Sequence, residues 1–266
     1  MNILDKIIAK KHVEVEQLKQ KGIPTFEFVP QTIPSLATCF NGKSTLNIIA
    51  EIKRSSPSKG AIQMDVNPVA QAKKYASLGA GAISVLTDQP FFNGSFADLA
   101  AVRNVVDLPI LCKDFIIDPV QIDAAKAAGA SIILLIAAAL TPDQFKRLYA
   151  HAQAAQMDVL FEVHDEREMQ FALEQQVPII GINNRNLETF EVDLQTTAKL
   201  AAMVENQDCT LISESGMRTK EDATFAANHG AQGILVGETF MRSSQLELAF
   251  SRMQVPIQKR VVPHDR

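Results

Sequence analysis

Eight short apolar segments alternate with segments of helical periodicity along most of the chain, and this alternation limits the possible folds more than any other feature. The apolar segments, which predict strands, span 47–53, 82–86, 109–113, 131–136, 158–163, 178–182, 209–213 and 233–236. The intervening segments, which predict helices, span 66–78, 96–106, 119–128, 141–156, 166–175, 194–204, 220–229 and 239–253. Strands that alternate with helices normally form a parallel sheet. Eight such units are the number that closes a (β/α)8 barrel.

The boundaries of several predicted helices carry their own signals. A capping residue followed by proline precedes three of them, at Asn67-Pro68, Asp118-Pro119 and Thr141-Pro142. A glycine follows three of the predicted helices, at Gly79, Gly129 and Gly230. Caps and terminal glycines of this kind mark where helices begin and end.

An open, doubly wound sheet is the alternative arrangement of the same elements. Such a sheet normally has a GxGxxG turn after its first strand, and the residues after position 53 contain none. We therefore predict an α/β protein whose residues 46–266 form a single (β/α)8 TIM barrel. Residues 1–45 are expected to form an N-terminal helical extension, with a helix near the start and a proline-containing segment after it.

The composition argues against several classes of function. The 266 residues carry a net charge of −4, which gives no electrostatic reason to bind nucleic acid or an anionic membrane. No apolar segment reaches transmembrane length, and the first residues lack the features of a secretory signal. The three cysteines and five histidines show no metal-ligand spacing, so a metal is not expected. The simplest expectation is a cytoplasmic monomer without an obligate protein partner.

Glu51 and Lys53 interrupt the first apolar segment, where an unpaired charge would be costly to bury. Side chains alternate along a strand, so both lie on the side of Ile49 and can point into the barrel. A single pair of this kind is most often a structural ion pair. The choice between an ion pair and a catalytic pair therefore depends on the residues at the ends of the other strands.

Ionisable or amide groups occur at the ends of most of the other predicted strands. They are found at Thr87-Asp88, Lys113-Asp114, Glu162-Val163-His164, Asn183–Asn186, Ser213–Gly216 and Gly237–Thr239. The carboxyl ends of barrel strands form the active face of TIM-barrel enzymes. Each group alone could be a surface pair or a helix cap, but their common position favours acid–base chemistry. With Lys53 and Lys113 facing one cavity, we expect a lowered lysine pKa, suited to proton donation near neutral pH.

The turns after the last two strands predict a phosphate site. Gly216 and Gly237 would let backbone N–H groups approach an anion, and Ser56 would add a hydroxyl from the loop after the first strand. The alternative is that the glycines serve only the tight turns. Glu238 would repel a phosphate, so its side chain is expected to point away while its backbone binds. The aromatic segment 91–95 either covers an aromatic substrate or packs on the barrel rim, and both possibilities stay open.

The segment Glu51–Gly60, EIKRSSPSKG, resembles the signature of the indole-3-glycerol-phosphate synthase family. The resemblance extends over essentially the whole chain. It continues in Leu86-Thr87-Asp88, Phe91–Ser95, Lys113-Asp114-Phe115, Glu162-Val163-His164, Gly181–Leu187, Glu214-Ser215-Gly216 and Val236-Gly237-Glu238.

This resemblance implies a TIM barrel that needs no metal or organic cofactor. The implied reaction converts 1-(2-carboxyphenylamino)-1-deoxyribulose 5-phosphate to indole-3-glycerol phosphate, CO2 and water. Lys113 would be the general acid, Glu162 would assist dehydration, and Lys53 would bind the substrate carboxylate. The other implied catalytic residues are Glu51, Asn183 and Glu214. The implied substrate-binding residues are Ser56, Phe92, Phe115, Arg185 and Ser215, and the implied phosphate-binding residues are Ser56, Gly216, Gly237 and Glu238.

Two positions depart from the pattern of the family. Ser55 stands where some relatives have lysine, and Glu238-Thr239 replaces the Ser-Ser of many members. Both changes affect the expected phosphate affinity and not the reaction type. Three other functions stay open at this point: a phosphoribosylanthranilate isomerase, a Schiff-base aldolase using Lys53 or Lys113, and a barrel that only binds phosphorylated ligands.

Overall fold

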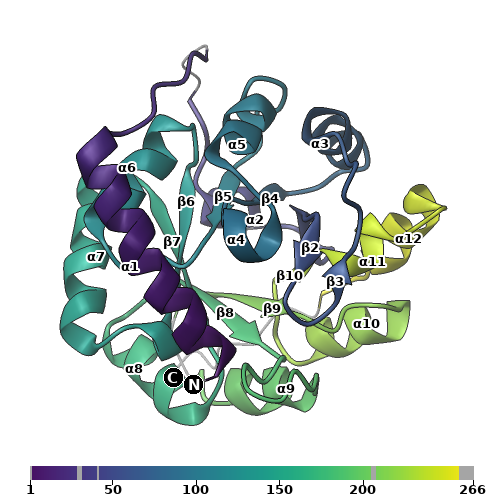
Figure 1. The fold of residues 1–266 in the computed structure, drawn as a ribbon. Helices are drawn as coiled ribbons and strands as arrows, with labels where there is room; N and C mark the ends of the chain where they lie inside the picture. Colours follow the sequence, from purple (N-terminus) through teal and green to yellow (C-terminus); the bar gives the residue numbers. More distant parts are fainter. Residues whose placement is uncertain (1, 29–31, 41, 205–207, 258–266) are drawn as a thin grey trace.

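The computed structural model describes residues 2–28, 32–40, 42–204 and 208–257. Parallel strands close into a barrel in the order β1-β10-β9-β8-β7-β6-β5-β4, with helices around the outside (Figure 1). The strands are β1 (Asn47–Ile52), β4 (Ala82–Leu86), β5 (Ile110–Lys113), β6 (Ile132–Ile136), β7 (Asp158–Val163), β8 (Ile179–Asn183), β9 (Thr210–Glu214) and β10 (Gly233–Val236). The predicted (β/α)8 barrel is therefore confirmed.

The helices of the outer layer match the predicted segments closely. They are α3 (Pro68–Ser77), α5 (Phe96–Arg103), α6 (Pro119–Ala127), α7 (Pro142–Ala154), α8 (Glu166–Glu174), α9 (Gln195–Ala201) and α10 (Lys220–Asn228). Asn67, Asp118 and Thr141 each accept a hydrogen bond from an amide of the first turn, as predicted.

The prediction of one continuous helix over 239–253 is wrong, because this segment forms two helices. These are α11 (Glu238–Met241) and α12 (Leu246–Met253). Between them the Gln245 amide donates to Oγ of Ser243 at 3.1 Å. Such a local bond to a serine side chain satisfies the backbone outside a helix and separates the two segments.

The alternation of side chains along the strands divides the core into two apolar layers. Ile49, Leu160 and Ile212 lie in the inner cluster, inside the barrel. Ile48 and Ala50 belong to the larger outer cluster between the strands and the helices. The predicted inward direction of β1 is thus confirmed, and it carries Glu51 to the inside one step beyond Ile49.

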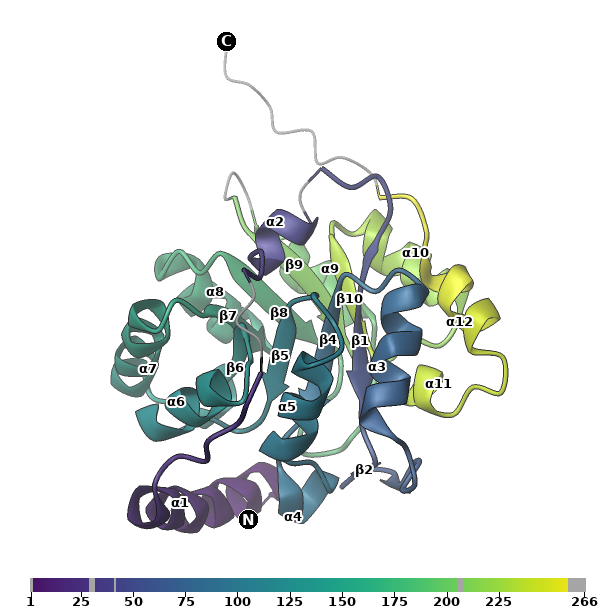
Figure 2. The ribbon, with the colours of Figure 1, turned by 90° about the horizontal axis from the view of Figure 1, so that it is seen from above.

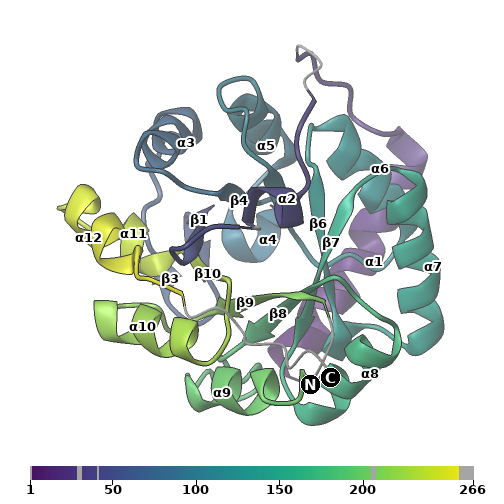
Figure 3. The ribbon, with the colours of Figure 1, turned by 180° about the vertical axis from the view of Figure 1, so that it is seen from behind.

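The N-terminal segment contributes one helix to each end of the barrel. Helix α1 (Ile3–Lys21) crosses the end where the strands finish, and α2 (Leu36–Phe40) lies at the opposite end (Figures 2 and 3). The side chains of Leu36 and Phe40 join the inner apolar cluster. The amide of Leu36 also donates to Oδ2 of Asp158, at the start of β7, at 2.7 Å. The sequence did not predict α2, because five residues are too few to show a helical period.

A buried ion-pair cluster fixes α1 to the barrel. Nζ of Lys11 lies 2.8 Å from Oδ2 of Asp88, 2.7 Å from Oδ1 of Asp114 and 2.7 Å from Oε2 of Glu14. Lys11 is only 2% exposed. Burial acts to lower the pKa of Lys11, but the charges of Asp114 and Asp88 raise it above its ordinary value. Helix α1 is therefore held by a full positive charge beside the ends of β4 and β5.

Short elements complete the end of the barrel that α1 crosses. They are the hairpin of β2 (Ser55–Ser56) and β3 (Gly60–Ala61), the helix α4 (Gln89–Phe92) and the 3-10 turn at Ala137–Ala139. Asp88 caps α4, and Asn93 ends it in the left-handed conformation. Within the described ranges no helix has the length and apolarity needed to cross a membrane.

Candidate active site

A cavity of about 390 Å³ opens at the end of the barrel where the strands finish. Every catalytic, substrate-binding and phosphate-binding residue that the family resemblance implied lines this one cavity. These residues are Glu51, Lys53, Ser56, Phe92, Lys113, Phe115, Glu162, Asn183, Arg185, Glu214, Ser215, Gly216, Gly237 and Glu238. The strand register brings them together: Asn183 on β8 pairs with Glu214 on β9, and Glu162 on β7 pairs with Gly181 on β8. Other strand-end residues, among them Thr87, Asp88 and His164, do not line the cavity.

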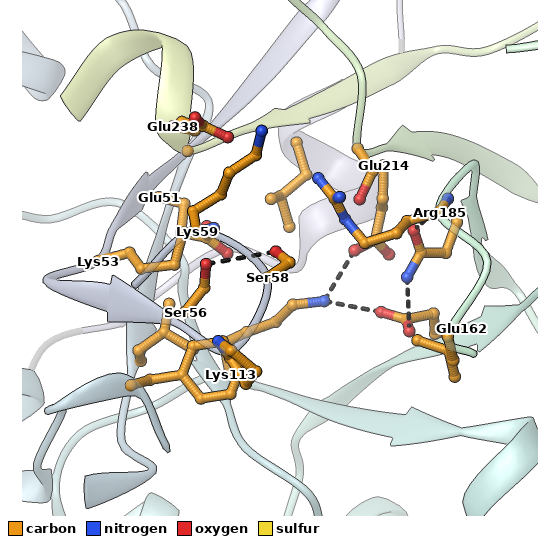
Figure 4. Close-up of a pocket in the computed structure, with 18 of the residues that line it drawn as sticks. Glu51, Lys53, Ser56, Ser58, Lys59, Lys113, Glu162, Arg185, Glu214 and Glu238 are labelled. Atoms are coloured by element: carbon orange, nitrogen blue, oxygen red, sulfur yellow. Dashed lines mark hydrogen bonds and ion pairs between the residues drawn. The ribbon is translucent and has the colours of Figure 1, made fainter. Parts of the chain in front are cut away.

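Lys113 lies at the centre of the charged groups. Its Nζ is 2.8 Å from Oε2 of Glu162 and 2.8 Å from Oε2 of Glu214 (Figure 4). Both carboxylates are almost fully buried, and the lysine side chain is 14% exposed. Two acids from different strands therefore hold one ammonium group at the floor of the cavity.

The expectation of a lowered lysine pKa is wrong for Lys113. Burial does act to lower its pKa, but the charges of Glu162, Glu214 and Glu51 raise the pKa above the ordinary value. A lowered pKa would require the two lysines to face each other. The structure instead separates them, with Lys113 between two glutamates and Lys53 against Glu51.

Glu162 receives positive charge and hydrogen bonds on both carboxylate oxygens. Lys113 occupies Oε2, and Nδ2 of Asn183 donates to Oε1 at 3.0 Å. Nε2 of His164 lies 3.2 Å from the same Oε1. Burial acts to raise the pKa of Glu162, but the Lys113 ammonium and the His164 ring hold it well below its ordinary value. Glu162 is thus an ionised base at the wall of the cavity.

The pKa of Glu214 is shifted in the opposite direction to that of Glu162. Burial, reinforced by the charges of Glu162 and Glu51, raises the pKa of Glu214 to about 7 although Lys113 acts against this. Its Oε1 is buried and has no hydrogen-bond partner within the described ranges. An acceptor without a donor favours the protonated acid, so the two glutamates around Lys113 differ in their readiness to hold a proton.

Glu51 and Lys53 form a second ion pair, with Oε1 and Nζ 2.5 Å apart. Glu51 is buried, whereas Lys53 is 17% exposed and lines the cavity. A β-carbon added at Gly237 would lie 2.1 Å from Oε1 of Glu51 and 3.2 Å from Nζ of Lys53. The missing side chain at Gly237 therefore provides the room in which this pair forms.

Three cations that were not predicted from the sequence line the cavity. Lys59, Arg218 and Arg242 all line the cavity beside Gly216 and Gly237. Each lies within eight residues of a predicted site residue, and this nearness was the available signal for finding them.

The two departures from the family pattern have local explanations. Ser55 is buried and does not line the cavity; its Oγ accepts a hydrogen bond from Nδ2 of Asn93 at 2.8 Å. Glu238 lines the cavity, and its Oε1 lies 3.3 Å from Nε of Arg242. The position of Ser55 thus faces α4, and the charge of Glu238 is partly offset by an arginine.

Aromatic and apolar side chains form part of the cavity wall. The rings of Phe92 and Phe115 lie 6.0 Å apart between centroids. Helix α1 adds Ile3, Leu4 and Ile7, which the sequence analysis did not include in the site. The segment 91–95 therefore faces the cavity through Phe92. A flat apolar group could lie between this wall and the charged floor.

Arg185 reaches the cavity from the loop after β8. Its backbone N–H donates to Oδ1 of Asn183 at 3.0 Å, and its Nη1 donates to the carbonyl of Phe190 at 3.1 Å. Burial lowers the pKa of Arg185 from its ordinary value, although the group stays a cation. Over the described ranges no group of three or more potential metal ligands occurs. The arrangement is suited to proton transfer to and from a bound organic anion.

Comparison with known proteins places these features in a family. The family model described as Indole-3-glycerol phosphate synthase matches residues 4–253. A protein from Oceanobacillus iheyensis named indole-3-glycerol phosphate synthase is 55% identical over 264 residues, covering 98% of this chain and 100% of that protein. Proteins of the same name from Exiguobacterium sibiricum and Bacillus thuringiensis are 52% and 46% identical, covering 91% and 96% of this chain and 93% and 99% of theirs.

Solved structures with low identity share the fold. A 3-hexulose-6-phosphate synthase superposes with a TM-score of 0.61 at 15% identity, covering 78% of this chain and 98% of that one. A thiamine phosphate pyrophosphorylase from Pyrococcus furiosus gives a TM-score of 0.58 at 16% identity, covering 78% and 93%.

Proposed function

The chain belongs to the indole-3-glycerol phosphate synthase family, and from this premise we propose how its cavity performs the reaction of that family. The protein is a carboxy-lyase of tryptophan biosynthesis that acts on a small phosphorylated substrate. The substrate is 1-(2-carboxyphenylamino)-1-deoxyribulose 5-phosphate. One carbon–carbon bond forms, between the ring carbon that bears the carboxylate and the ketone carbon. CO2 and then water leave to give the indole.

Lys113 is the general acid for ring closure. Attack on the ketone places negative charge on its oxygen, and a buried ammonium at that point can stabilise the charge and donate a proton. The paired glutamates keep Lys113 protonated and fix its Nζ at the floor of the cavity. The observation that carries this proposal is the ammonium held between two buried carboxylates.

Glu162 assists the loss of water. After CO2 leaves, the hydroxyl formed from the ketone must depart as water, and a proton must leave the neighbouring ring CH2 so that the carbon–carbon double bond of the indole forms. The ionised Glu162 shares Lys113 as a partner, so acid and base lie 2.8 Å apart. Glu214 and Asn183 orient this pair, and Ser215 is next to them in the cavity wall.

The remaining residues hold the two ends of the substrate. Lys53, aligned by Glu51, binds the carboxylate that is lost. Arg185 lies near the aromatic ring, which rests against Phe92 and Phe115. At the other end Ser56 and the backbone N–H groups at Gly216, Gly237 and Glu238 bind the phosphate, with support from the nearby cations.

We also propose that the enzyme works as a cytoplasmic monomer without a metal or cofactor. One chain supplies the acid, the base and the anion-binding groups of the cavity. Besides the bond formation and CO2 loss within the substrate itself, the chemistry as written needs only proton transfers, and these side chains can perform them.

The test is a fluorescence assay for the indole product, using purified protein, the carboxyphenylamino-deoxyribulose phosphate and no added metal. Wild-type protein should form product, and Lys113→Ala should lose at least about 10³-fold in kcat, in the range expected for a general acid. Binding of a phosphorylated substrate analogue should persist in this variant.

Lys199→Ala is the matched control. Lys199 is also paired with a glutamate, Glu166, but on the exposed surface. Its kcat should stay at the wild-type value. Near-normal turnover by Lys113→Ala would contradict the role of the lysine. Absence of product with the folded wild-type protein would contradict the proposed reaction, and a stable adduct after borohydride treatment would instead indicate a Schiff-base aldolase.

A further inference from the structure

His164 lies behind Glu162, between two carboxylates. Its Nε2 is 3.2 Å from Oε1 of Glu162, and its Nδ1 is 3.0 Å from Oε2 of Glu168. The same Oε2 of Glu168 accepts a hydrogen bond from the His164 backbone N–H at 2.7 Å. The ring is 14% exposed and is not part of the cavity wall. His164 therefore contacts the proposed base from the side away from the substrate.

The contacts of the ring favour its charged form. If Nδ1 donates to Glu168, a neutral ring would turn the lone pair of Nε2 toward a carboxylate oxygen 3.2 Å away, which is repulsive. A proton on Nε2 turns this contact into an attraction. Nε2 is buried and has no hydrogen-bond partner within the described ranges, so its contact with Glu162 is one of charge. Burial acts to lower the pKa of His164, but Glu162 and Glu168 raise it to about 10.

The charges around this histidine come from four elements. Glu162 lies on β7 and Glu168 on α8, and both face the ring. Beyond Glu162, Lys113 on β5 and Glu214 on β9 complete the ion-pair chain. The order along this ion-pair chain is thus acid, cation, acid, cation, acid, from Glu168 to Glu214. If His164 lost its charge, Lys113 would be the remaining cation in contact with the Glu162 carboxylate among the described residues.

We propose that His164 is a positioning residue, which Glu168 holds as an imidazolium so that it orients Glu162 and keeps it ionised for the reaction. This inference rests on the proposed role of Glu162 in dehydration. It adds a function for His164 and Glu168, neither of which lines the cavity. In the sequence His164 was noted among the polar groups at the strand ends but was given no role, and residue spacing does not show its two carboxylate partners.

The first test needs no substrate. Protein labelled with ¹⁵N-histidine is followed by NMR from pH 6 to 10, and the His164 signals are identified by their absence in His164→Gln. His164 should remain an imidazolium at pH 8, where an ordinary histidine with a pKa of about 6.5 is neutral. In Glu168→Gln the midpoint should move to lower pH, because one of the two carboxylates that raise the pKa is lost. A neutral ring at pH 8 would overturn the proposal.

The second test separates charge from shape by kinetics. Glutamine keeps a hydrogen-bond donor without the charge, so His164→Gln should lower kcat by about tenfold, as for other groups that orient a reacting residue, with KM within about twofold. The acidic limb of the kcat profile should move to higher pH, because the pKa of Glu162 rises when a neighbouring cation is removed. A loss of kcat without this movement would mean a structural role and would contradict the proposal, and so would unchanged kcat.

His151→Gln is the matched control, because His151 also pairs with a carboxylate, Asp123, at 2.7 Å but away from the cavity wall. Its kcat and pH profile should be those of the wild type. Failure of the proposed function is recognised separately, since wild-type protein would then form no indole product while the NMR titration could still be measured.

Discussion

At the scale of single residues, the site depends on two glycines, whose lack of a side chain leaves room for buried glutamates. A β-carbon at Gly181 would lie 2.1 Å from Oε1 of Glu214, and one at Gly237 would lie equally close to Oε1 of Glu51. Both glycines sit on or next to the strand beside the acid. In the sequence Gly237 was considered for the phosphate or for the tight turn after its strand. The structure gives it a second task, which is to leave space for the Glu51–Lys53 pair.

Gly237→Ala should therefore impair catalysis without unfolding the barrel. Displacement of Glu51 would move Lys53, and a shift of about 1 Å in such a group can lower kcat/KM by about 10²-fold. Steady-state kinetics with the indole assay measures the loss. Gly42→Ala is the control, since no atom lies within 4 Å of its added carbon. Its φ of 72° should cost about 1 kcal/mol of stability but leave kcat/KM unchanged. Equal activity of the two variants would contradict the packing argument.

Most of the site could be predicted from the sequence because alternation along a strand is a strict geometric rule. It placed Glu51, Glu162 and Glu214 inside the barrel, and the structure confirms this. It could not show which acid meets which lysine, because pairing depends on the register between strands. For that reason the predicted direction of the lysine pKa was wrong, and the two carboxylate partners of His164 were not foreseen. The catalytic and binding roles of these residues remain predictions.

At the scale of elements, α1 forms part of the active-site wall and is held to the barrel by the ion pairs of Lys11. Its apolar residues face the cavity, while Lys11 reaches Asp88 and Asp114 at the ends of β4 and β5. Thr87 donates to the other oxygen of Asp114, Oδ2, at 2.6 Å. Asp114 comes directly after Lys113 in the chain. The attachment of the helix and the position of the proposed general acid are thus coupled through one backbone segment.

Lys11→Met should loosen α1 and destabilise the protein. It leaves two buried aspartates without their cation, and breaking a buried ion pair in this way costs about 3–5 kcal/mol. Urea unfolding followed by circular dichroism measures the change, and KM should rise because the wall is no longer fixed. Lys10→Met, at an exposed neighbouring position, should change the free energy of unfolding by less than about 0.5 kcal/mol. A stable Lys11 variant with normal KM would show that the ion-pair cluster does not hold the helix.

The elements that were predicted correctly are those with a clear period and a clear cap. The eight strands and seven of the helices match their segments to within a few residues. The hairpin of β2 and β3, the single turn of α4 and the short α2 were missed, because each has too few residues to show a pattern. The break between α11 and α12 coincides with a local hydrogen bond from Gln245 to Ser243, which the periodicity of the segment does not show. The division of the chain at residue 45 stays a prediction.

At the scale of the whole molecule, one end of the barrel carries the proposed active site and the other end contributes to stability. The charged groups gather where the strands finish, and the opposite end is closed by α2. Phe40 fills this end: its ring would contact a β-carbon added at Gly81 or at Gly233, at 2.8 Å and 2.6 Å. This division matches the general rule that one face of such barrels carries chemistry and the other stability.

Phe40→Ala should consequently reduce stability and spare activity. Loss of a buried phenylalanine costs about 3–5 kcal/mol through the cavity that it leaves. Thermal unfolding should show a lower Tm, while kcat/KM measured well below that temperature should equal the wild-type value. Leu248→Ala, at a side chain that is 43% exposed, should change neither quantity appreciably. A large fall in kcat/KM for the phenylalanine variant would mean that the two ends are not independent.

The attachments of the N-terminal segment also set an order of events in folding. The Leu36 amide donates a hydrogen bond to Asp158, which lies 122 residues later in the chain. The ion pairs of Lys11 can form only after Asp88 and Asp114 have been synthesised. During synthesis α1 and α2 emerge first, yet their partners are made long afterwards. Contacts between residues so distant in the chain form slowly. Catalytic activity should therefore return later in refolding than helix content does, because the barrel must assemble before its first helix can close over it.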